Sequence, residues 1–258
     1  MDRFDLIVAF ILGLFIFIPN TDSLAGGIFQ IEEFYHWNAC AVSAALAYLK
    51  GGVLYGDFIP QYGVGWPVLL ATLHPVFSLT YAHVINFAML FAIAYYYSVF
   101  LFLRTLGFNR ILSFAATFFC VTILILPGAE PESKSIIWRW GGGAPMRSPL
   151  DMVFFSTLFL HLRDPRHRSA SLLGALAGFN LLFSIDGGLF LMATMVSTWG
   201  FLMFFTKQRH AFRTSLCSIA VALGVLFAGL SIATRGTLFS QQFVSVVLAP
   251  IFHWGKKY

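Results

Sequence analysis

Charged residues are scarce in this sequence, where Asp, Glu, Lys and Arg make up 10% of the 258 residues. A soluble domain usually has about a quarter of its residues charged, so this composition excludes a soluble globular domain. Hydrophobic residues reach 59%, with 30 phenylalanines and a mean hydropathy of +0.80. We therefore expect an all-α, polytopic transmembrane helical bundle.

Metal-ligand patterns are also lacking. Cys40, Cys120 and Cys217 are far apart, and the sequence has no Cys-x-x-Cys and no His–Cys cluster of metal-ligand spacing. We therefore expect no cofactor, assign no metal-binding residue and leave open whether a metal takes part. No internal repeat of the transporter kind is visible, so residues 1–258 are interpreted as one membrane domain.

The formal net charge of +5 comes from 16 Lys and Arg against 11 Asp and Glu. An excess of basic residues can indicate nucleic-acid binding, but here these residues fall mostly in short segments between apolar runs. Basic short loops are typical of the cytoplasmic side of a membrane protein. The charge therefore predicts orientation, and we expect no nucleic-acid partner.

The first apolar run, residues 6–19, has the length of a signal-peptide core. No convincing cleavage site follows it, because the sequence after the nearest candidate, around Ala25, is just as hydrophobic. We interpret the run as an uncleaved first span that keeps Arg3 on the cytoplasmic side.

The apolar stretch 66–73 decides the orientation of everything after it. It is roughly half as long as a membrane crossing requires, so we expect it to lie on the outer surface. The basic residues then gather on the cytoplasmic side, around Arg104, between residues 163 and 168, and between residues 207 and 213. Counting 66–73 as a span would place all three groups outside. The further spans are expected at residues 84–103, 111–126, 150–162, 170–184, 188–205, 215–233 and 243–253.

This arrangement gives about eight spans with both termini in the cytoplasm. Residues 20–82 become a large first exoplasmic loop, and residues 83–258 hold the remaining spans. The loop is expected to have two interfacial helices, at residues 36–49 and 66–73, because their aromatic and small residues with little charge suit the headgroup layer. The other outer segments are expected at residues 128–148, 185–187 and 235–242.

Three carboxylates and a histidine lie close together in the first loop. Glu32 and Glu33 either complement the dipole of the helix that follows or supply a general base beside the membrane surface. Asp57 is either a turn residue or a functional carboxylate. His36 and Trp37 either anchor the interface or bind a substrate.

The outer loop before the fourth apolar run contains Trp138, Arg139 and Arg147. Arginines on the exoplasmic side are unexpected, because basic residues of membrane proteins concentrate in cytoplasmic loops. They either bind an anionic ligand, because a guanidinium matches phosphate geometry, or contact outer-leaflet phosphates and nearby glutamates. Asp186 stands at the outer edge of an apolar run, where an ionisable group is by default a functional candidate unless a glycine-rich turn keeps it wet.

The first loop resembles that of a known family. Residues 33–38 read EFYHWN, residues 52–58 read GVLYGDF and residues 61–63 read QYG, with Val64 where proline is frequent. This ordered set resembles the first exoplasmic loop of bacterial multi-span glycosyltransferases of the GT-C type, which are relatives of the aminoarabinose and protein O-mannosyl transferases. The chain is shorter than most members of that family.

The resemblance implies transfer of a sugar from a polyprenyl-phosphate carrier to an acceptor on the exoplasmic face. It implies Glu33 as the catalytic carboxylate, with Glu32 second and Asp57 as a further candidate. By analogy, Arg147 and then Arg139 would hold the carrier phosphate. The substrate-binding candidates also include the aromatic and polar side chains His36, Trp37, Gln61, Tyr62, Trp138 and Asp186.

The resemblance also implies a location in the bacterial inner membrane and contact with membrane lipid. The alternative is a non-catalytic scaffold subunit that uses the same fold within a larger membrane complex, a role that the short chain and aromatic spans favour. Other membrane proteins are its expected partners in that case.

Overall fold

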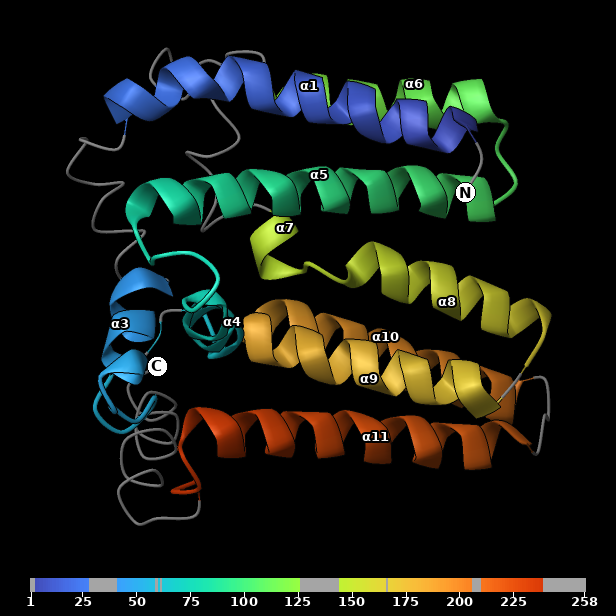
Figure 1. The fold of residues 1–258 in the computed structure, drawn as a ribbon. Coiled ribbons are helices and arrows are strands. Elements are labelled where there is room, and N and C mark those ends of the chain that lie inside the picture. The colour runs from blue at the N-terminus through green and yellow to red at the C-terminus, as the bar shows by residue number, and fades with distance from the viewer. Residues whose placement is uncertain are drawn as a thin grey trace, which may run out of the picture.

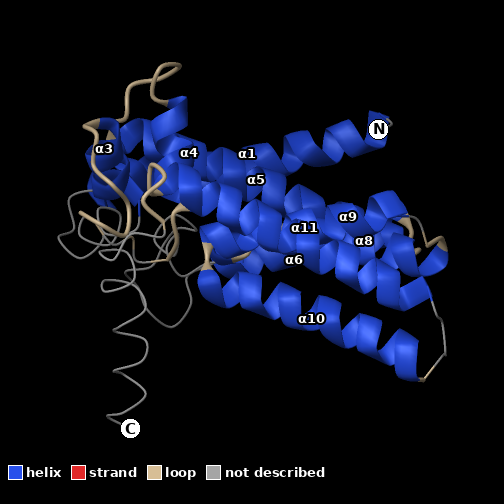
Figure 2. Ribbon diagram, turned by 90° about the horizontal axis from the view of Figure 1, so that it is seen from below, coloured by secondary structure: helices blue, strands red, loops and turns tan. Residues whose placement is uncertain are grey.

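The computed structural model describes residues 3–27, 41–58, 60, 62–125, 144–165, 167–205 and 210–238. Within these ranges the regular structure is helical, with one isolated bridge between Leu54 and Phe58 (Figure 2). The described chain therefore has the all-α fold expected from its composition.

Seven helices run back and forth along one direction (Figure 1). They are α1 (Arg3–Gly27), α5 (Tyr81–Thr105), α6 (Arg110–Ile125), α8 (Asp151–Arg163), α9 (His167–Phe183), α10 (Ile185–Phe204) and α11 (His210–Ala233). The spans expected at residues 6–233 each fall on one of these helices, and the span expected at 243–253 lies outside the described residues. The bounds of the first span were wrong, because α1 continues to Gly27, so residues 20–27 are helical and do not belong to a loop.

Three stretches of the described chain are long and apolar enough to cross a membrane: Asn86–Thr105, Ile185–Phe204 and Ala211–Ala233. The helices α6 and α9 are apolar but shorter. A protein with such helices is a membrane protein in composition and shape.

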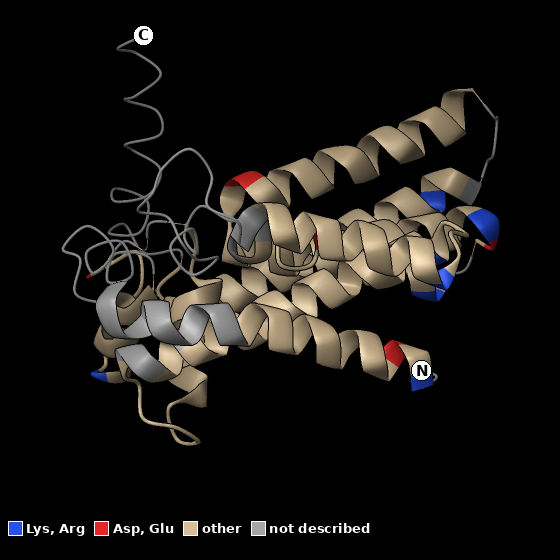
Figure 3. Ribbon diagram, turned by 90° about the horizontal axis from the view of Figure 1, so that it is seen from above, with Lys and Arg blue, Asp and Glu red and all other residues tan. Residues whose placement is uncertain are grey.

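The two ends of the bundle differ in what they contain. One end is formed by the described parts of residues 41–80, 144–150, 184–188 and 234–238, and we call it the loop end. The other, the arginine end, is made of helix termini and has six arginines (Figure 3). These are Arg3, Arg104, Arg110, Arg163, Arg168 and Arg213.

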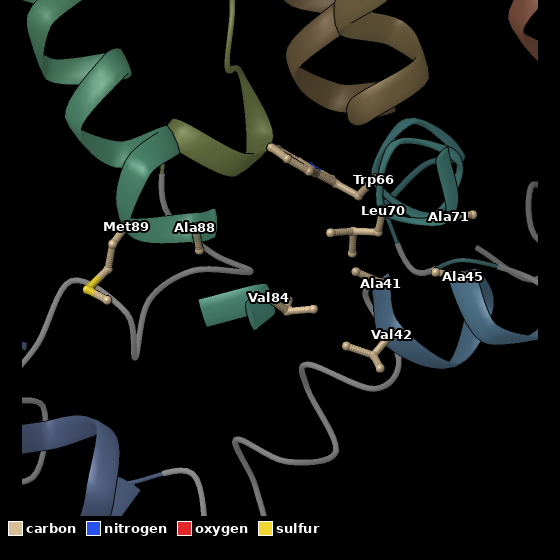
Figure 4. Close-up of a cluster of buried hydrophobic side chains, with 9 residues drawn as sticks. All are labelled: Ala41, Val42, Ala45, Trp66, Leu70, Ala71, Val84, Ala88 and Met89. Atoms are coloured by element: carbon tan, nitrogen blue, oxygen red, sulfur yellow. The ribbon is translucent and has the colours of Figure 1, made fainter. Parts of the chain in front are cut away.

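Short helices α3 (Ser43–Leu49) and α4 (Gly65–Leu73) lie at the loop end, and α4 is seen end-on in Figure 1, across the direction of the long helices. Trp66 of α4 is 2% exposed. Its ring centre lies 4.9 Å from that of Phe91 of α5 and 4.8 Å from that of Phe183 of α9, and both ring pairs are edge-to-face. Together with Ala41, Val42 and Leu70 it fills a core between the short helices and the bundle (Figure 4).

Small residues bring α9 and α11 into close contact. A side chain at Gly174 would collide with the carbonyl oxygen of Ser218, and one at Gly178 with that of Ala222. The Ser218 hydroxyl also reaches across to the carbonyl oxygen of Ala170, at 3.0 Å. This pairing of small residues at four-residue spacing is a common way for membrane helices to pack.

The segment 185–187 is part of a helix, which corrects the expected turn. Ser184, with extended backbone angles, is the single residue between α9 and α10, and α10 begins at Ile185. Glycines had suggested a turn, but Gly187 and Gly188 instead let α10 approach its neighbours, since a side chain at Gly188 would collide with the backbone of Leu181. Asp186 therefore lies in the first turn of α10.

Candidate functional site

Three of the residues expected to bind substrate meet at the loop end. Arg147 ends the short helix α7 (Ala144–Arg147), Tyr62 precedes α4, and Asp186 is in the first turn of α10. The Arg147 Nη1 lies 3.6 Å from Asp186 Oδ2, and the guanidinium carbon lies 5.3 Å from the centre of the Tyr62 ring. Three segments distant in the chain thus place an arginine, a carboxylate and a phenol together.

The backbone after α7 is fixed by its neighbours. Leu150 N–H donates to Asn180 Oδ1 of α9, at 3.3 Å. A side chain at Gly187 would collide with the carbonyl oxygen of Arg147 and with Ser148 Oγ. The first turn of α10 therefore packs directly on the backbone that positions Arg147.

Asn180 is fully buried, and its amide nitrogen has no hydrogen-bond partner within the described chain. A Cβ built at Gly187 would lie 3.1 Å from that nitrogen. A buried polar group that makes no hydrogen bond destabilises an apolar bundle, whereas the side-chain oxygen of Asn180 does have a hydrogen-bond partner. Here its oxygen holds the start of α8 close behind Arg147.

The Arg147–Asp186 ion pair is partly exposed, with 45% and 61% of the two side chains accessible. Such pairs contribute at most about 1 kcal/mol. The Ser184 hydroxyl also donates to Asp186 Oδ1, which holds the carboxylate in place. Within the described ranges, Asp186 is the one polar partner of Arg147, and this contact leaves other N–H groups of the guanidinium without a described partner.

Asp57 has a local role. Its Oδ2 accepts a hydrogen bond from Val53 N–H at 2.9 Å, and Tyr55 N–H donates to the Phe58 carbonyl at 2.7 Å. Tyr55 has a φ of 65°, in the left-handed region typical of tight turns. Burial in this turn raises the pKa of the Tyr55 hydroxyl. The two hydrogen bonds support the interpretation of Asp57 as a turn residue.

Arg235 connects this turn to the end of α11. Its Nη2 donates to the Tyr48 carbonyl at 2.7 Å and its Nε to the Gly52 carbonyl at 3.3 Å, while the guanidinium lies 4.7 Å from the Tyr48 ring centre. Tyr48 returns a hydrogen bond from its hydroxyl to the Ile232 carbonyl, at 2.9 Å. The sequence placed Arg235 in an outer loop but did not reveal these contacts.

The other expected site residues lie outside the described residues. They are Glu32, Glu33, His36, Trp37, Gln61, Trp138 and Arg139. Within the described ranges, no group of three or more His, Cys, Asp or Glu side chains is placed to hold a metal ion. The described site joins one guanidinium, one carboxylate and one phenol ring, and its guanidinium suits an anionic ligand.

No protein-family model, curated protein or solved structure matches this chain. The described chain has the helical fold and the apolar composition of a membrane protein.

Proposed function

We propose that this chain is a GT-C-type glycosyltransferase that moves a sugar from a polyprenyl-phosphate carrier to an acceptor on the exoplasmic face of the bacterial inner membrane. The observation that carries the proposal is the meeting of Arg147, Tyr62 and Asp186 at the loop end. Tyr62 belongs to the QYG motif of the resemblance, and Arg147 was expected to bind phosphate.

The proposed roles follow from the reaction. An acceptor oxygen attacks the anomeric carbon, and the bond from that carbon to the phosphate oxygen breaks, so the electron pair and negative charge go to the departing phosphate. A guanidinium with free N–H groups stabilises that charge, which is the role of Arg147. Asp186 orients the guanidinium, and the Tyr62 ring packs against the substrate.

The acceptor proton needs a base on the opposite side of the sugar. Glu33 is proposed to take it, with Glu32 second, because Glu33 begins the first loop motif and Glu32 comes directly before it. The hydrogen bond between Asp57 and Val53 N–H makes Asp57 the weakest of the three candidates.

The proposal includes a topology of about eight spans with both termini in the cytoplasm. It is supported by the alternating direction of the long helices and by the arginines at one end of the bundle (Figures 1 and 3). In that orientation the arginine end faces the cytoplasm and the loop end faces outward.

The test is transfer by the purified protein from a panel of polyprenyl-phosphate sugars. Removing a group that stabilises the developing charge typically lowers the rate by about 100-fold, which is the expected effect of Arg147→Ala. Glu33→Gln should lower it by about 100-fold or more, because a general base is lost. Arg163→Ala is the matched control, since this exposed arginine at the other end lies over Phe159.

Transfer that survives both Glu33→Gln and Arg147→Ala would overturn the proposed roles. No transfer from any donor, together with copurification of a larger membrane assembly, would favour the scaffold alternative.

A further inference from the structure

A cavity lies between α5 and α8, away from the loop end. The cavity has a volume of about 410 Å³ and is lined by Ser98, Leu101, Arg104, Thr105, Val153 and Ser156. It combines one cation, three hydroxyls and two aliphatic side chains. None of these residues belongs to the site proposed above.

Arg104 supplies the cation of this cavity. Its Nη1 donates to the Phe108 carbonyl at 2.9 Å, which caps the end of α5, and the described chain offers the guanidinium no other partner. Its remaining N–H groups are thus available to an anion. Because the apolar span Asn86–Thr105 ends beside it, Arg104 lies at the depth where phospholipid headgroups begin.

The three hydroxyls of the cavity are oriented as acceptors. Ser98 donates to the Tyr95 carbonyl at 2.6 Å, Thr105 to the Leu101 carbonyl at 2.9 Å, and Ser156 to the Met152 carbonyl at 2.8 Å. With each hydrogen directed at its own helix, the oxygen lone pairs face a ligand that donates. Thr105 is next to Arg104 at the end of α5, whereas Ser98 lies about 9 Å further into the bundle along the same helix. A ligand that fits must therefore present an anion to Arg104 and a hydroxyl donor to Thr105.

The rim of the cavity is apolar and open to the side. Leu101 and Val153 are 40% and 37% exposed, and both lie on helices within the apolar bundle. A free anion in water would gain nothing from this rim, whereas an acyl chain would pack along it. The rim therefore indicates that the ligand comes from the bilayer.

We propose that this cavity binds the headgroup of an anionic, hydroxyl-bearing phospholipid such as phosphatidylglycerol, with the phosphate at Arg104 and an acyl chain along Leu101 and Val153. The lipid comes from the leaflet that meets the arginine end. This site is independent of the proposed transferase function.

The test is lipid retention by the purified protein in native mass spectrometry, with phosphatidylglycerol and phosphatidylcholine of identical chains. We expect preferential retention of phosphatidylglycerol and about a fivefold weaker affinity in Arg104→Gln, the effect of one arginine near an anionic surface. Arg104→Lys should restore most of the affinity. Arg163→Gln, at the same end, is the matched control and should change it little.

A second variant keeps the charge unchanged. Thr105→Val should reduce the preference for phosphatidylglycerol over phosphatidylmethanol, which has the same charge but no headgroup hydroxyl. Ser98→Ala combined with Ser156→Ala is the control and should leave this preference unchanged, because both serines lie further into the bundle. Soluble glycerol phosphate should fail to displace the lipid, because it lacks the chains.

Three results would overturn the proposal: equal retention of phosphatidylcholine, an unchanged affinity in Arg104→Gln, or displacement by glycerol phosphate at the affinity of the lipid. The last result would identify a site for a free anion instead. If Arg104→Gln does not fold, Thr105→Val still decides, because an unchanged preference over phosphatidylmethanol in that variant would equally contradict the proposal.

Discussion

The arginines at the two ends of the bundle make different kinds of contact. At the arginine end, Arg104 bonds to Phe108 and Arg163 lies over Phe159, both within one helical turn or its cap, and Arg110 lies over the Phe4 ring of α1, with 5.9 Å between the guanidinium carbon and the ring centre. At the loop end, Arg147 reaches Tyr62 and Asp186, and Arg235 bonds to carbonyls 183 and 187 positions away.

A contact within one helical turn finishes a helix, whereas hydrogen bonds and ion pairs between distant segments fix those segments relative to one another. Such polar contacts position the side chains of the loop end, and the arginine end is a set of helix termini. A reaction centre needs the first kind of surface, because its groups must be held in a defined geometry.

Trp66→Ala is expected to destabilise the loop end more than any other substitution considered below. This side chain fills the core that joins α4 to α5 and α9 (Figure 4), and truncation of a buried aromatic residue costs about 3–5 kcal/mol. We expect a large fall in melting temperature in detergent. Val76→Ala is the control at the same end, since Val76 is 80% exposed, and an equal fall there would contradict the account.

A smaller effect is expected from Gly187→Ala, which forces a methyl group against the Arg147 carbonyl and Ser148 Oγ. Overpacking of this kind costs about 1–3 kcal/mol, and it should also displace Arg147 and lower transfer. Gly200→Ala on the same helix is the matched control, because nothing lies within 4 Å of its added carbon. Alanine there should be neutral or stabilising. Equal melting temperatures for the two variants would argue against the close approach.

Arg235→Ala should cost about 1 kcal/mol, because the hydrogen bonds that it removes are exposed to solvent. The turn at residues 51–58 should then become more open to limited proteolysis, while the long helices keep their protection. Arg168 is an exposed arginine at the other end, and Arg168→Ala should change neither the stability nor the rate of proteolysis. An unchanged cleavage rate in Arg235→Ala would show that its hydrogen bonds to Tyr48 and Gly52 do not hold this turn in place.

Asp186→Asn should have the smallest effect on stability, below about 1 kcal/mol, because the ion pair with Arg147 is partly exposed. Its effect should appear in transfer, through a less well oriented guanidinium. A melting temperature that falls as far as in Gly187→Ala would show that the carboxylate is structural.

The helices were predictable from the sequence because apolar runs separated by basic or glycine-rich segments determine where helices lie. The short run at 66–73 predicted a helix too short to cross, and α4 covers nearly the same residues. The start of α10 was mispredicted, because Gly187 and Gly188 can supply either a turn or a close contact, and only the neighbouring backbone decides between them.

The site was predictable only as a set of candidates. Arg147 stood out as an outer arginine and Asp186 as a charge at an apolar edge, but their pairing depends on how α7 docks on α10, which no local pattern encodes. Asn180, a polar residue inside an apolar run, was the signal that could have indicated the docking point. The contacts of Arg235 had no such signal, because they join segments 183 and 187 positions apart.

The most direct test of the central claim is photo-crosslinking of a polyprenyl-phosphate analogue, with the adduct mapped by mass spectrometry. The account predicts adducts at residues 144–150 and 184–188 of the loop end, lost in Arg147→Ala and retained in Arg163→Ala. Adducts confined to the arginine end, or a loop-end adduct that is unchanged in Arg147→Ala, would contradict it.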